Sequence, residues 1–383
     1  NNLGFSKVID HTWDDKFAVS GAKIGDTLRL REAPRYAVTK GAVMTPQNTV
    51  DSNKTLTLDQ QAVVGISFSS VERTLSIDQF SARYLESAAV ALANQIDVDG
   101  LTMAYQQTGN SVGDPATIMT TLDFAYAAGR LLDESSAPVD GKRYMVISPK
   151  LQEATLKAAM PLFNSQTQIA SQYTKGRMGT MGGFEWIMDQ NVRTHTYGAR
   201  GGAPQVGAAS QTGSTLAVTG FTAAAAPRLK KGDTFTLPLV YKANYLTGDS
   251  TGQLQTFTVT ADVSSLADGS ASIPISPPIT PTGTNKTVTA SPAAGAPLTL
   301  IGTASATSTQ NIAFHKSAFV LGMAPLQVPA NKEAANAQDP DTGVSIRTIT
   351  DYDILNDQFI TRIDCLYGWA APRSEWAVRV LTP

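Results

Sequence analysis

One stretch constrains the fold most, because residues 77–107 predict a single long amphipathic helix. Ser76 is an N-cap residue with Gln79 three positions later, which is a capping box, and Leu75 and Phe80 occupy the positions of a hydrophobic staple. Apolar residues then recur every four positions on one face: Phe80, Tyr84, Ala88, Leu92 and Ile96. Such a helix would span roughly 45 Å, which is long for a globular domain.

The segments before this helix predict extended structure. Residues 1–33 show little periodicity and predict an N-terminal arm that ends in a strand. Residues 34–62 predict a long β-hairpin whose second strand includes residues 55–58. A hairpin with so little apolar mass is marginal alone, so we expect it to lie on a neighbour. Residues 63–68 predict a buried strand.

An α/β unit is predicted after the long helix. Asp114-Pro115 and Ser148-Pro149 each join an N-cap residue to a first-turn proline, and so predict two further helices, the second ending near residue 159. Strands are predicted over residues 144–147 and 184–188.

The composition changes between about residues 198 and 310, where the chain is rich in Thr, Ser, Ala, Gly and Pro and contains no Glu. Short strands are predicted over residues 215–219, 234–239, 254–263, 272–276, 287–290 and 298–301. They indicate a small barrel or sandwich. The alternative is a disordered Ser/Thr linker. The alternation of Phe235, Leu237 and Leu239 argues against this alternative. Longer strands resume over residues 314–321, 344–349, 357–368 and 376–381, which is the pattern of an inserted all-β domain.

The composition favours a chain that contacts copies of itself. Only 16% of the 383 residues are charged, against roughly 25% in an average domain, while 42% are hydrophobic. The net charge of −2 and the lack of long basic blocks argue against a dedicated nucleic-acid binder. No apolar run reaches the ~18 residues of a membrane span. An ordinary monomer with a bland surface is the alternative.

The first residues and the single cysteine bear on processing and compartment. The start at Asn1 is not a signal peptide and lacks an initiator Met, which predicts processing or trimming. Cys365 is the only cysteine, so no internal disulfide forms, which fits synthesis in a reducing cytoplasm. Because Cys365 lies in a predicted strand, we expect it in the core.

The sequence predicts no catalytic, cofactor-binding or metal site. His11, His195 and His315 lie in three separate segments without a Gly-x-Ser-x-Gly elbow, so each is expected to be a surface or packing residue. One Cys with scattered His gives no zinc spacing. The Gly-rich residues 176–183 lack the Lys-Ser/Thr of a phosphate loop and precede a strand, so they predict a flexible loop.

Pairs of acids two positions apart occur in three places: Asp97 with Asp99, Asp339 with Asp341, and Asp351 with Asp353. The first two precede glycines, Gly100 and Gly343, as in a calcium loop, but both lack the closing Glu at the twelfth position. We expect these acids to be solvated. The third pair would need a pocket to act in acid/base chemistry.

The order of the segments resembles the major capsid proteins of tailed bacteriophages, which have the Hong Kong 97 phage fold. In that family an extended hairpin precedes a long spine helix in a peripheral domain. An axial domain follows, before the chain returns to the peripheral domain. Coat proteins of a short-tailed-phage subgroup carry a β-barrel inserted in the axial domain. Three motifs are similar to theirs: Leu229-Lys-Lys-Gly232-Asp233-Thr-Phe235, Asn311-Ile-Ala-Phe314-His315-Lys-Ser-Ala318-Phe319 with Ala324-Pro325-Leu326, and Arg362-Ile-Asp364-Cys365-Leu366-Tyr367-Gly368.

The resemblance implies an α+β chain with a defined plan. Its parts would be an N-terminal arm (1–33), an extended hairpin (34–62), a peripheral domain (63–115) with the spine helix (77–107), an axial domain (116–313) interrupted by an inserted β domain (198–310), and a return to the peripheral domain (314–383). We expect the α/β body to fold without residues 200–310.

The resemblance also implies a function. The chain would be a structural protein and not an enzyme, self-assembling as hexamers and pentamers into the icosahedral shell around a phage genome. Scaffolding and portal proteins would be partners, contact with packaged DNA would be non-specific, and assembly in the host cytoplasm would precede residence in the virion. Some relatives cross-link a hairpin Lys to an Asn of a neighbour, for which Lys40 or Lys54 with Asn356 would correspond.

Two alternatives come from other classes of protein. The Thr/Ser/Ala-rich middle also suits another β-rich self-assembling surface or lattice protein, such as a surface-layer or adhesin subunit. An enzyme with a dispersed site using His195 or His315 is the third hypothesis.

Overall fold

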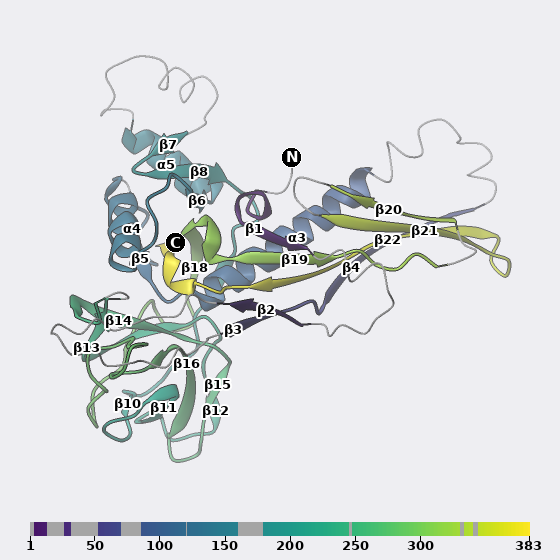
Figure 1. Cartoon of the computed structure of the whole chain (residues 1–383). Coiled ribbons are helices and arrows are strands. Elements are labelled where there is room, and N and C mark those ends of the chain that lie inside the picture. The colour runs from purple at the N-terminus through teal and green to yellow at the C-terminus, as the bar shows by residue number, and fades with distance from the viewer. Residues whose placement is uncertain are drawn as a thin grey trace, which may run out of the picture. The chain divides into compact units, whose positions relative to one another are not determined.

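The computed structural model describes residues 4–13, 27–31, 53–69, 86–119, 121–159, 179–244, 247–329, 333–339 and 344–383. These residues are mostly β-structure, with three α-helices, α3 (Glu86–Gln107), α4 (Asp123–Glu134) and α5 (Pro149–Ala159). The chain forms two compact units: unit 1 is Asn1–Arg31, Asn53–Leu101 and Phe319–Pro372, and unit 2 is Glu32–Ser52, Thr102–Ala318 and Arg373–Pro383. Figure 1 shows the order of the elements.

Unit 1 is built on one sheet in which strand β22 has three partners. The strands of this sheet are β1 (Asp10–Trp13), β4 (Gln60–Ser69), β19 (Val320–Ala324), β20 (Glu333–Gln338), β21 (Ser345–Asp353) and β22 (Gln358–Ala370). Their order is β1-β19-β22-β21-β20. Strands β21 and then β19 pair along one edge of β22, and β4 pairs along the other. All these pairs are antiparallel except β1 with β19, which is parallel.

Helix α3 packs against this sheet through a glycine. Ala88, Leu92 and Ile96, on the predicted apolar face, are buried as expected. A Cβ on Gly100 would lie 2.4 Å from Cζ2 of Trp369, so the glycine that weakly interrupts the helical pattern lets β22 approach the helix closely. The predicted cap and staple, and the start of the helix at residue 77, lie outside the described residues.

The prediction of an extended arm is wrong for residues 4–13, which belong to the core of unit 1. Phe5 and Ile9 are fully buried, and the Phe5 ring stacks on Trp369 with ring centroids 5.5 Å apart. Asp97 on α3 accepts hydrogen bonds from the backbone N–H of Gly4 (2.7 Å) and of Ser6 (3.0 Å), and from the Ser6 hydroxyl. The buried Asp97 carboxylate therefore supplies the hydrogen-bond acceptors for the donors of Gly4 and Ser6.

The expectation of solvated acids at Asp97 and Asp99 is also wrong. Asp97 has no exposed surface. Asp99 Oδ2 accepts a hydrogen bond of 2.5 Å from the hydroxyl of Tyr367. Burial and this hydrogen bond raise the pKa of Tyr367. Both acids hold other parts of unit 1 to the helix, a role that their spacing could not reveal.

The predicted hairpin is present, but it begins earlier than expected. Strands β2 (Thr27–Arg31) and β3 (Asn53–Thr57) pair antiparallel, with Thr27 opposite Thr57 and Arg31 opposite Asn53. The strand assigned to the end of the arm is thus the first strand of the hairpin. Residues 32–52 between the two strands lie outside the described residues.

A pair of glycines seats the end of this hairpin on the sheet of unit 1. Gly322 and Gly368 are directly opposite each other in β19 and β22. A Cβ on Gly368 would lie 1.9 Å from the carbonyl oxygen of Thr57, and one on Gly322 would lie 2.5 Å from Cδ2 of Leu56. Leu56 is fully buried there. We call Gly322 and Gly368 the glycine notch.

Two predicted strands, one in unit 1 and one at the passage from unit 2 to unit 1, differ in the structure. Strand β4, which includes residues 63–68, was expected to be buried, but its residues alternate between exposed and half-buried. The single strand expected over residues 314–321 is interrupted by a 3₁₀ turn, Lys316–Ala318, between β18 and β19. The chain passes from unit 2 to unit 1 directly after this turn.

Unit 2 contains a second sheet with α4 and α5. Its strands are β5 (Ser111–Gly113), β6 (Arg143–Ile147), β7 (Thr180–Met181), β8 (Phe184–Met188), β9 (Thr194–Thr196), β18 (Thr307–His315) and β23 (Ala377–Thr382), in the order β5-β23-β18-β6-β8-β7 with β9 also on β18. Ser148 caps α5 as predicted, because its hydroxyl accepts from Leu151 N at 3.3 Å. Asp114-Pro115 does not begin a helix: Asp114 closes a turn onto Thr117, and α4 begins at Asp123.

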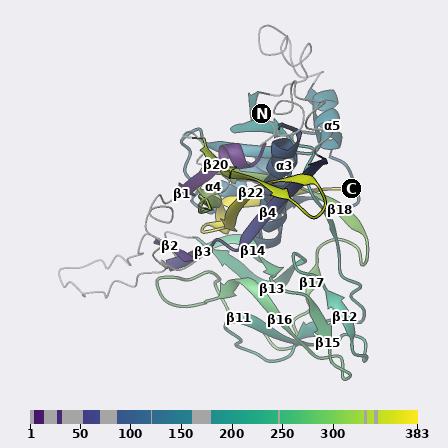
Figure 2. The same ribbon diagram turned by 90° about the vertical axis from the view of Figure 1, so that its right-hand side faces the viewer.

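Residues 205–300, within the predicted inserted segment, form a separate β-structure in unit 2 (Figure 2). Its strands are β10 (Gln205–Val206), β11 (Gly213–Thr219), β12 (Ala226–Leu229), β13 (Thr234–Ala243), β14 (Ser250–Val259), β15 (Val263–Ser265), β16 (Ala271–Ile279) and β17 (Thr299–Leu300). The main sheet runs β10-β11-β16-β14-β13-β17. Its ends are joined by hydrogen bonds from Val206 N to Ala296 O (2.9 Å) and from Leu298 N to Pro204 O (3.0 Å), so the sheet closes into a barrel.

The barrel has its own apolar core, which explains why this polar segment folds. Phe235, Leu237 and Phe257 are fully buried within a cluster of Val, Leu, Ile and Phe side chains. Leu239, the next residue of the predicted alternation, is 71% exposed at a positive φ of 64°, because the register of β13 shifts there. The strand predicted over residues 287–290 is only an isolated bridge from Val288 to Lys242.

The glycine notch generates a prediction on stability. We expect Gly368→Ala to lower the free energy of unfolding by about 3 kcal/mol, because the backbone oxygen of Thr57 must move. Gly322→Ala should cost less, about 1–2 kcal/mol, because it meets the end of the Leu56 side chain. Gly65→Ala is the matched control, since its Cβ would meet nothing within 4 Å. Urea unfolding of the full chain measures all three, and equal effects would contradict the notch.

Candidate anchoring site and assembly surface

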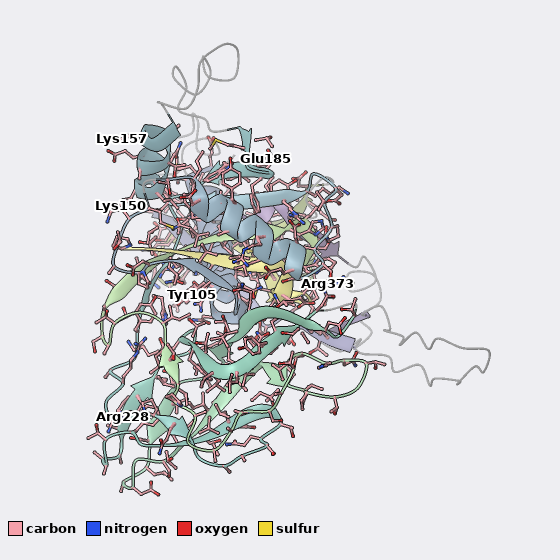
Figure 3. The ribbon with its side chains drawn as sticks, turned by 90° about the vertical axis from the view of Figure 1, so that its left-hand side faces the viewer. Tyr105, Lys150, Lys157, Glu185, Arg228 and Arg373 are labelled. Carbon is pink, nitrogen blue, oxygen red and sulfur yellow. The ribbon has the colours of Figure 1, made fainter. Side chains whose placement is uncertain are left out.

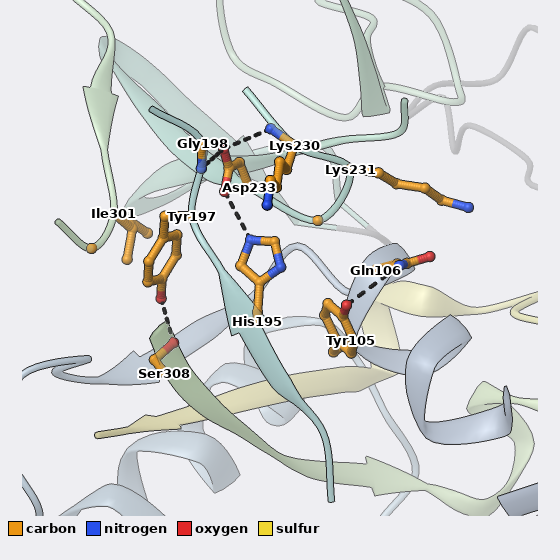
Figure 4. Close-up of polar contacts among 12 residues, drawn as sticks. Tyr105, Gln106, His195, Tyr197, Gly198, Lys230, Lys231, Asp233, Ile301 and Ser308 are labelled. Carbon is orange, nitrogen blue, oxygen red and sulfur yellow. Dashed lines mark hydrogen bonds and ion pairs between the residues drawn. The ribbon is translucent and has the colours of Figure 1, made fainter. Parts of the chain in front are cut away.

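A buried carboxylate, Asp233, organises the base of the barrel. It follows the turn made by Lys231 and Gly232, where Gly232 has a φ of +97°. Asp233 Oδ2 accepts hydrogen bonds from the backbone N–H of Gly198 (3.1 Å) and of Lys230 (3.0 Å). Figure 4 shows these contacts at the point where the chain enters the barrel. The carboxylate thus ties the barrel's first residue to its first long hairpin.

His195 links this carboxylate to the second sheet. It lies on β9, which pairs with β18, and its Nε2 donates to Asp233 Oδ1 at 2.8 Å (Figure 4). The ring packs against Tyr105 and, edge-on, against Tyr197, at centroid distances of 5.5 and 5.0 Å. His195 is only 3% exposed, so it is a packing residue, as expected.

Arg379 reaches the same base from β23. Its Nη1 donates to the carbonyl of Gly232 at 2.8 Å, and its side chain is 1% exposed. Burial lowers the pKa of Arg379 to about 10, and the nearby charge of Asp233 opposes this. The sequence offered no signal for this residue, because a lone Arg in an apolar strand has many possible partners. We call Asp233, His195 and Arg379 the base cluster.

Two further contacts hold the barrel to the rest of unit 2. Lys242 on β13 donates to the hydroxyl of Ser135 (2.5 Å), directly after α4, and to Asn110 Oδ1 (3.4 Å). The hydroxyl of Thr258 on β14 donates to the carbonyl of Thr108 at 3.1 Å. Burial lowers the pKa of Lys242 to about 8, although the charges of Glu134 and Glu375 favour its protonated form. Desolvation is therefore the stronger effect at this lysine.

A second buried arginine stabilises the far part of the barrel. Arg228 on β12, labelled in Figure 3, donates from Nε to the hydroxyl of Ser265 at 2.8 Å. Its other nitrogens donate to the carbonyls of Arg200, Thr222 and Ala224. The guanidinium thus satisfies loop carbonyls inside the barrel wall, a structural role.

His315, the second histidine of unit 2, has partners of its own. His315 is 4% exposed, with Nε2 3.1 Å from Asp140 Oδ1 and its ring edge-on to Trp376. It is therefore a packing residue too. His11 is half-buried in β1. The His195–Asp233 pair has almost no exposed surface.

The remaining candidate residues have structural surroundings. Cys365 is buried as expected, and burial raises the pKa of its thiol to about 11. Gly182 and Gly183 form the turn between β7 and β8, while residues 176–178 lie outside the described residues. Asp339 is exposed, and Asp341 is not described. In the part of the chain that the structure describes, no three His, Cys, Asp or Glu residues group to hold a metal.

The turn between β21 and β22 exposes two large apolar side chains. Ile354 is 82% exposed and Leu355 is 93% exposed. Asp353, one of the predicted acid pair, accepts from Leu355 N (3.0 Å) and from Asn356 Nδ2 (2.7 Å), and these bonds lower its pKa. Asp357 accepts from the hydroxyl of Tyr352 at 2.8 Å. We call Asp353 to Asp357 the hairpin tip, an ordered surface that is both apolar and acidic.

An ion cluster lies further along the same strands. Asp364 on β22 accepts from Nε and Nη2 of Arg347 (3.0 and 2.7 Å), from Nε of Arg362 (2.8 Å) and from Gln61 (2.9 Å). Burial opposes ionisation of Asp364, but the arginine hydrogen bonds outweigh it and hold its pKa below the usual value. Asp351 of β21, directly opposite Ile360, lies on the same face of the sheet, so two carboxylates balance the two guanidinium groups there.

The proposed cross-linking residues are not arranged for that reaction within the chain. Lys54 Nζ donates to the carbonyl of Pro372, and the Asn356 amide is held by Asp353. Lys40 lies outside the described residues. A cross-link to a neighbouring copy stays a prediction.

Among the described residues, no helix combines the length and the apolar character needed to cross a membrane.

Comparison with known proteins gives a family match over most of the chain. The family described as "P22 coat protein - gene protein 5" matches residues 46–380. No curated protein matches. Similar solved structures include Mycobacterium phage Che8 (13% identity, TM-score 0.46, 94% of this chain and 85% of that one) and the capsid of the Cyanophage P-SCSP1u (10%, 0.48, 99% and 88%). Another is the mature capsid of bacteriophage PhiM1 (10%, 0.45, 100% and 87%). All three TM-scores are below 0.5, so the family assignment rests on the family match.

The base cluster predicts a large effect at one aspartate of the barrel and a small one at another. We expect Asp233→Ala to lower the free energy of unfolding by about 3 kcal/mol, because two buried backbone N–H groups and His195 lose their acceptor. Asp268→Ala, at an exposed turn where Asp268 accepts only from Ser270, should cost less than about 1 kcal/mol. Urea unfolding compares the two, and a mild Asp233→Ala would contradict the anchoring role.

Lys242 predicts a dependence of stability on pH. Its pKa is about 8 in the folded chain and 10.5 in an unfolded one, so the unfolded state binds more protons between these values. Stability should therefore rise as the pH rises from about 8 to 10, by at most roughly 3 kcal/mol from this group. Lys242→Met should remove the rise, and replacement of the exposed Lys231 by Met should keep it. Urea unfolding at pH 7 and pH 10 tests this, and an unchanged slope in Lys242→Met would refute it.

Proposed function

Because the chain belongs to the P22 coat protein family, we propose that it works as a hexamer- and pentamer-forming subunit of an icosahedral shell that encloses a phage genome. The family match over residues 46–380 carries this conclusion. It identifies a structural major capsid protein and favours that function over a surface-layer or adhesin subunit. The sealed His195–Asp233 pair gives no support to the enzyme hypothesis.

We propose that the chain follows the Hong Kong 97 plan, with an inserted β domain at residues 198–310. Helix α3 would be the spine helix, and β2 with β3 the base of the extended hairpin. The closed barrel and its separate core support the insertion. The domain limits would be those implied by the resemblance, with one adjustment: the hairpin would begin at β2, before residue 34.

Assembly would depend on many weak contacts. The low charge of the chain reduces the cost of bringing large surfaces together, and contacts between identical copies add up around a closed shell. Scaffolding and portal proteins would guide the assembly in the host cytoplasm. Packaged DNA would be confined by the volume of the shell and neutralised by counter-ions. The net charge of −2 supports the non-specific contact with DNA.

The proposed function predicts that the full chain assembles and that assembly is lost when the hairpin of β2 and β3 is shortened. Electron microscopy and size exclusion of the purified protein should show rings or shells. Replacing residues 32–52 by Asn-Gly should leave folded monomers, because β2 and β3, whose last pair is Arg31 with Asn53, can still pair across a two-residue turn. A wild-type chain that remains monomeric in every condition would refute the function, and a shortened chain that forms normal shells would refute the role of the hairpin.

A further inference from the structure

The amine of Lys242 and the side-chain amide of Asn110 meet where the barrel joins the rest of unit 2. Lys242 Nζ lies 3.4 Å from Asn110 Oδ1 and 2.5 Å from the hydroxyl oxygen of Ser135. Asn110 is 9% exposed and Ser135 is 1% exposed. Lys242 belongs to β13 of the barrel, whereas Asn110 lies between α3 and β5, and Ser135 directly follows α4. A primary amine therefore faces a carboxamide across two parts of the fold.

Backbone contacts fix the orientation of this amide. Asn110 Nδ2 donates to the carbonyl oxygens of Glu375 (3.1 Å) and Ala377 (3.2 Å). The backbone carbonyl of Asn110 in turn accepts from the N–H of Arg379 at 2.8 Å. The side-chain amide cannot turn over without losing both of its own hydrogen bonds, so Oδ1 stays toward Lys242. Holding two groups in this way removes much of the entropic barrier to a reaction between them.

The surroundings of Lys242 make its amine a nucleophile. Burial lowers the pKa of Lys242 from 10.5 to about 8, so part of the amine is unprotonated near neutral pH. Desolvated lysines of this kind act as nucleophiles toward carbonyl groups. The charged groups that face Lys242 are Glu134 of α4 and Glu375 of the 3₁₀ turn η5 (Ser374–Trp376). Both charges oppose loss of the proton, but desolvation outweighs them.

A carboxylate oxygen without a hydrogen-bond partner belongs to the same cluster. Among the described residues, Glu134 Oε2 is buried and accepts no hydrogen bond, while Oε1 pairs with Arg130 at 2.7 Å. Glu134 directly precedes Ser135 in the sequence, and its charge acts on Lys242. A buried acceptor without a donor is costly. Proton transfer between the amine and the amide is a use for this oxygen that would offset the cost.

We propose that Lys242 and Asn110 of one chain form an isopeptide bond that ties the barrel to the rest of unit 2, with Glu134 as the proton carrier. The lone pair of Lys242 Nζ forms a bond to Cγ of Asn110, the bond from Cγ to Nδ2 breaks, and ammonia leaves. One proton of the amine passes through the Glu134 carboxylate to the departing nitrogen. Glu134 is regenerated, and the exchange of one amide for another needs no further reactant. The bond lies within one chain and is independent of the proposed shell-forming function.

Mass spectrometry of the full chain tests the bond. Chains kept at pH 9, above the pKa of Lys242, should lose the mass of one ammonia, and digestion should give a branched peptide that joins Lys242 to Asn110. Chains kept at pH 6 should retain the mass of the sequence, because the amine is protonated there. Lys242→Arg is the matched control and should retain its full mass at both pH values. A succinimide at Asn110 also loses ammonia, but it gives no branched peptide.

Two glutamate variants distinguish a proton carrier from a nearby charge. As charges alone, Glu134 and Glu375 both keep Lys242 protonated, so replacing either one would speed the reaction. We expect Glu375→Gln to form the bond at least as fast as the wild type. Glu134→Gln should form it roughly a hundredfold more slowly, the lower end of what a positioned acid or base contributes. Equal acceleration in both variants would overturn the role of Glu134.

The bonded chain should also differ in its pH dependence. Its Lys242 no longer titrates, so the rise in stability from about pH 8 to 10 that belongs to the free amine should be absent from the bonded fraction. Folded wild-type chains that retain their full mass after long incubation at pH 9 would overturn the proposal. So would a succinimide at Asn110, or cross-links between copies without the branched peptide in the monomer. None of these results bears on whether the chain forms shells.

Discussion

Strand β22 is the constraint on which the rest of unit 1 depends. Its thirteen residues are paired along both edges, and its two faces have separate tasks. On one face Tyr367 and Trp369 meet α3, at Asp99 and Gly100. On the other, Gly368 admits β3 and Asp364 collects two arginines. A one-residue slip of this strand would exchange the faces and place the ion cluster against the helix. The register of β22 therefore fixes the positions of helix α3, of the hairpin of β2 and β3, and of the ion cluster.

The base of the barrel in unit 2 is held by polar contacts instead of apolar ones. Asp233 and Arg379 are buried and Lys242 is half-buried, and each costs desolvation energy that its contacts offset only when the partners are in place. Such contacts specify one geometry more strongly than an apolar patch would, since a shifted barrel would leave charges unpaired. They also bear on the expectation that the α/β body folds without residues 200–310. Removal of Gly232 and Asp233 would leave Arg379 and His195 buried without these acceptors, so the barrel is less separable than its composition indicates.

Several features could be predicted from the sequence because they depend on neighbours along the chain. The apolar face of α3, the Ser148 cap of α5, most of the strands and the burial of Cys365 follow from local periodicity and capping. The errors have different physical origins. Asp114 closes a local turn with Ala116 and Thr117 instead of starting a helix, whereas Asp97 was taken for a surface acid because its partners, Gly4 and Ser6, are 93 and 91 residues away in sequence. The base cluster joins residues from β9, the turn before β13, and β23, so no local pattern contains it. The hairpin tip was missed for a different reason: two adjacent apolar residues in an acidic turn do not fit a periodic pattern.

Several of the few charged side chains of this chain are buried, where they fix the geometry of the fold. Buried charges fix the barrel and the ion cluster, while the two large apolar side chains of the hairpin tip are exposed. An isolated protein gains nothing from Ile354 and Leu355 in water. Their burial against a partner would be worth about 2 kcal/mol for each side chain. A contact of that size is weak alone, so a misplaced subunit can leave. Repeated around a closed ring it becomes cooperative, which suits a subunit that must first find its place and then remain there.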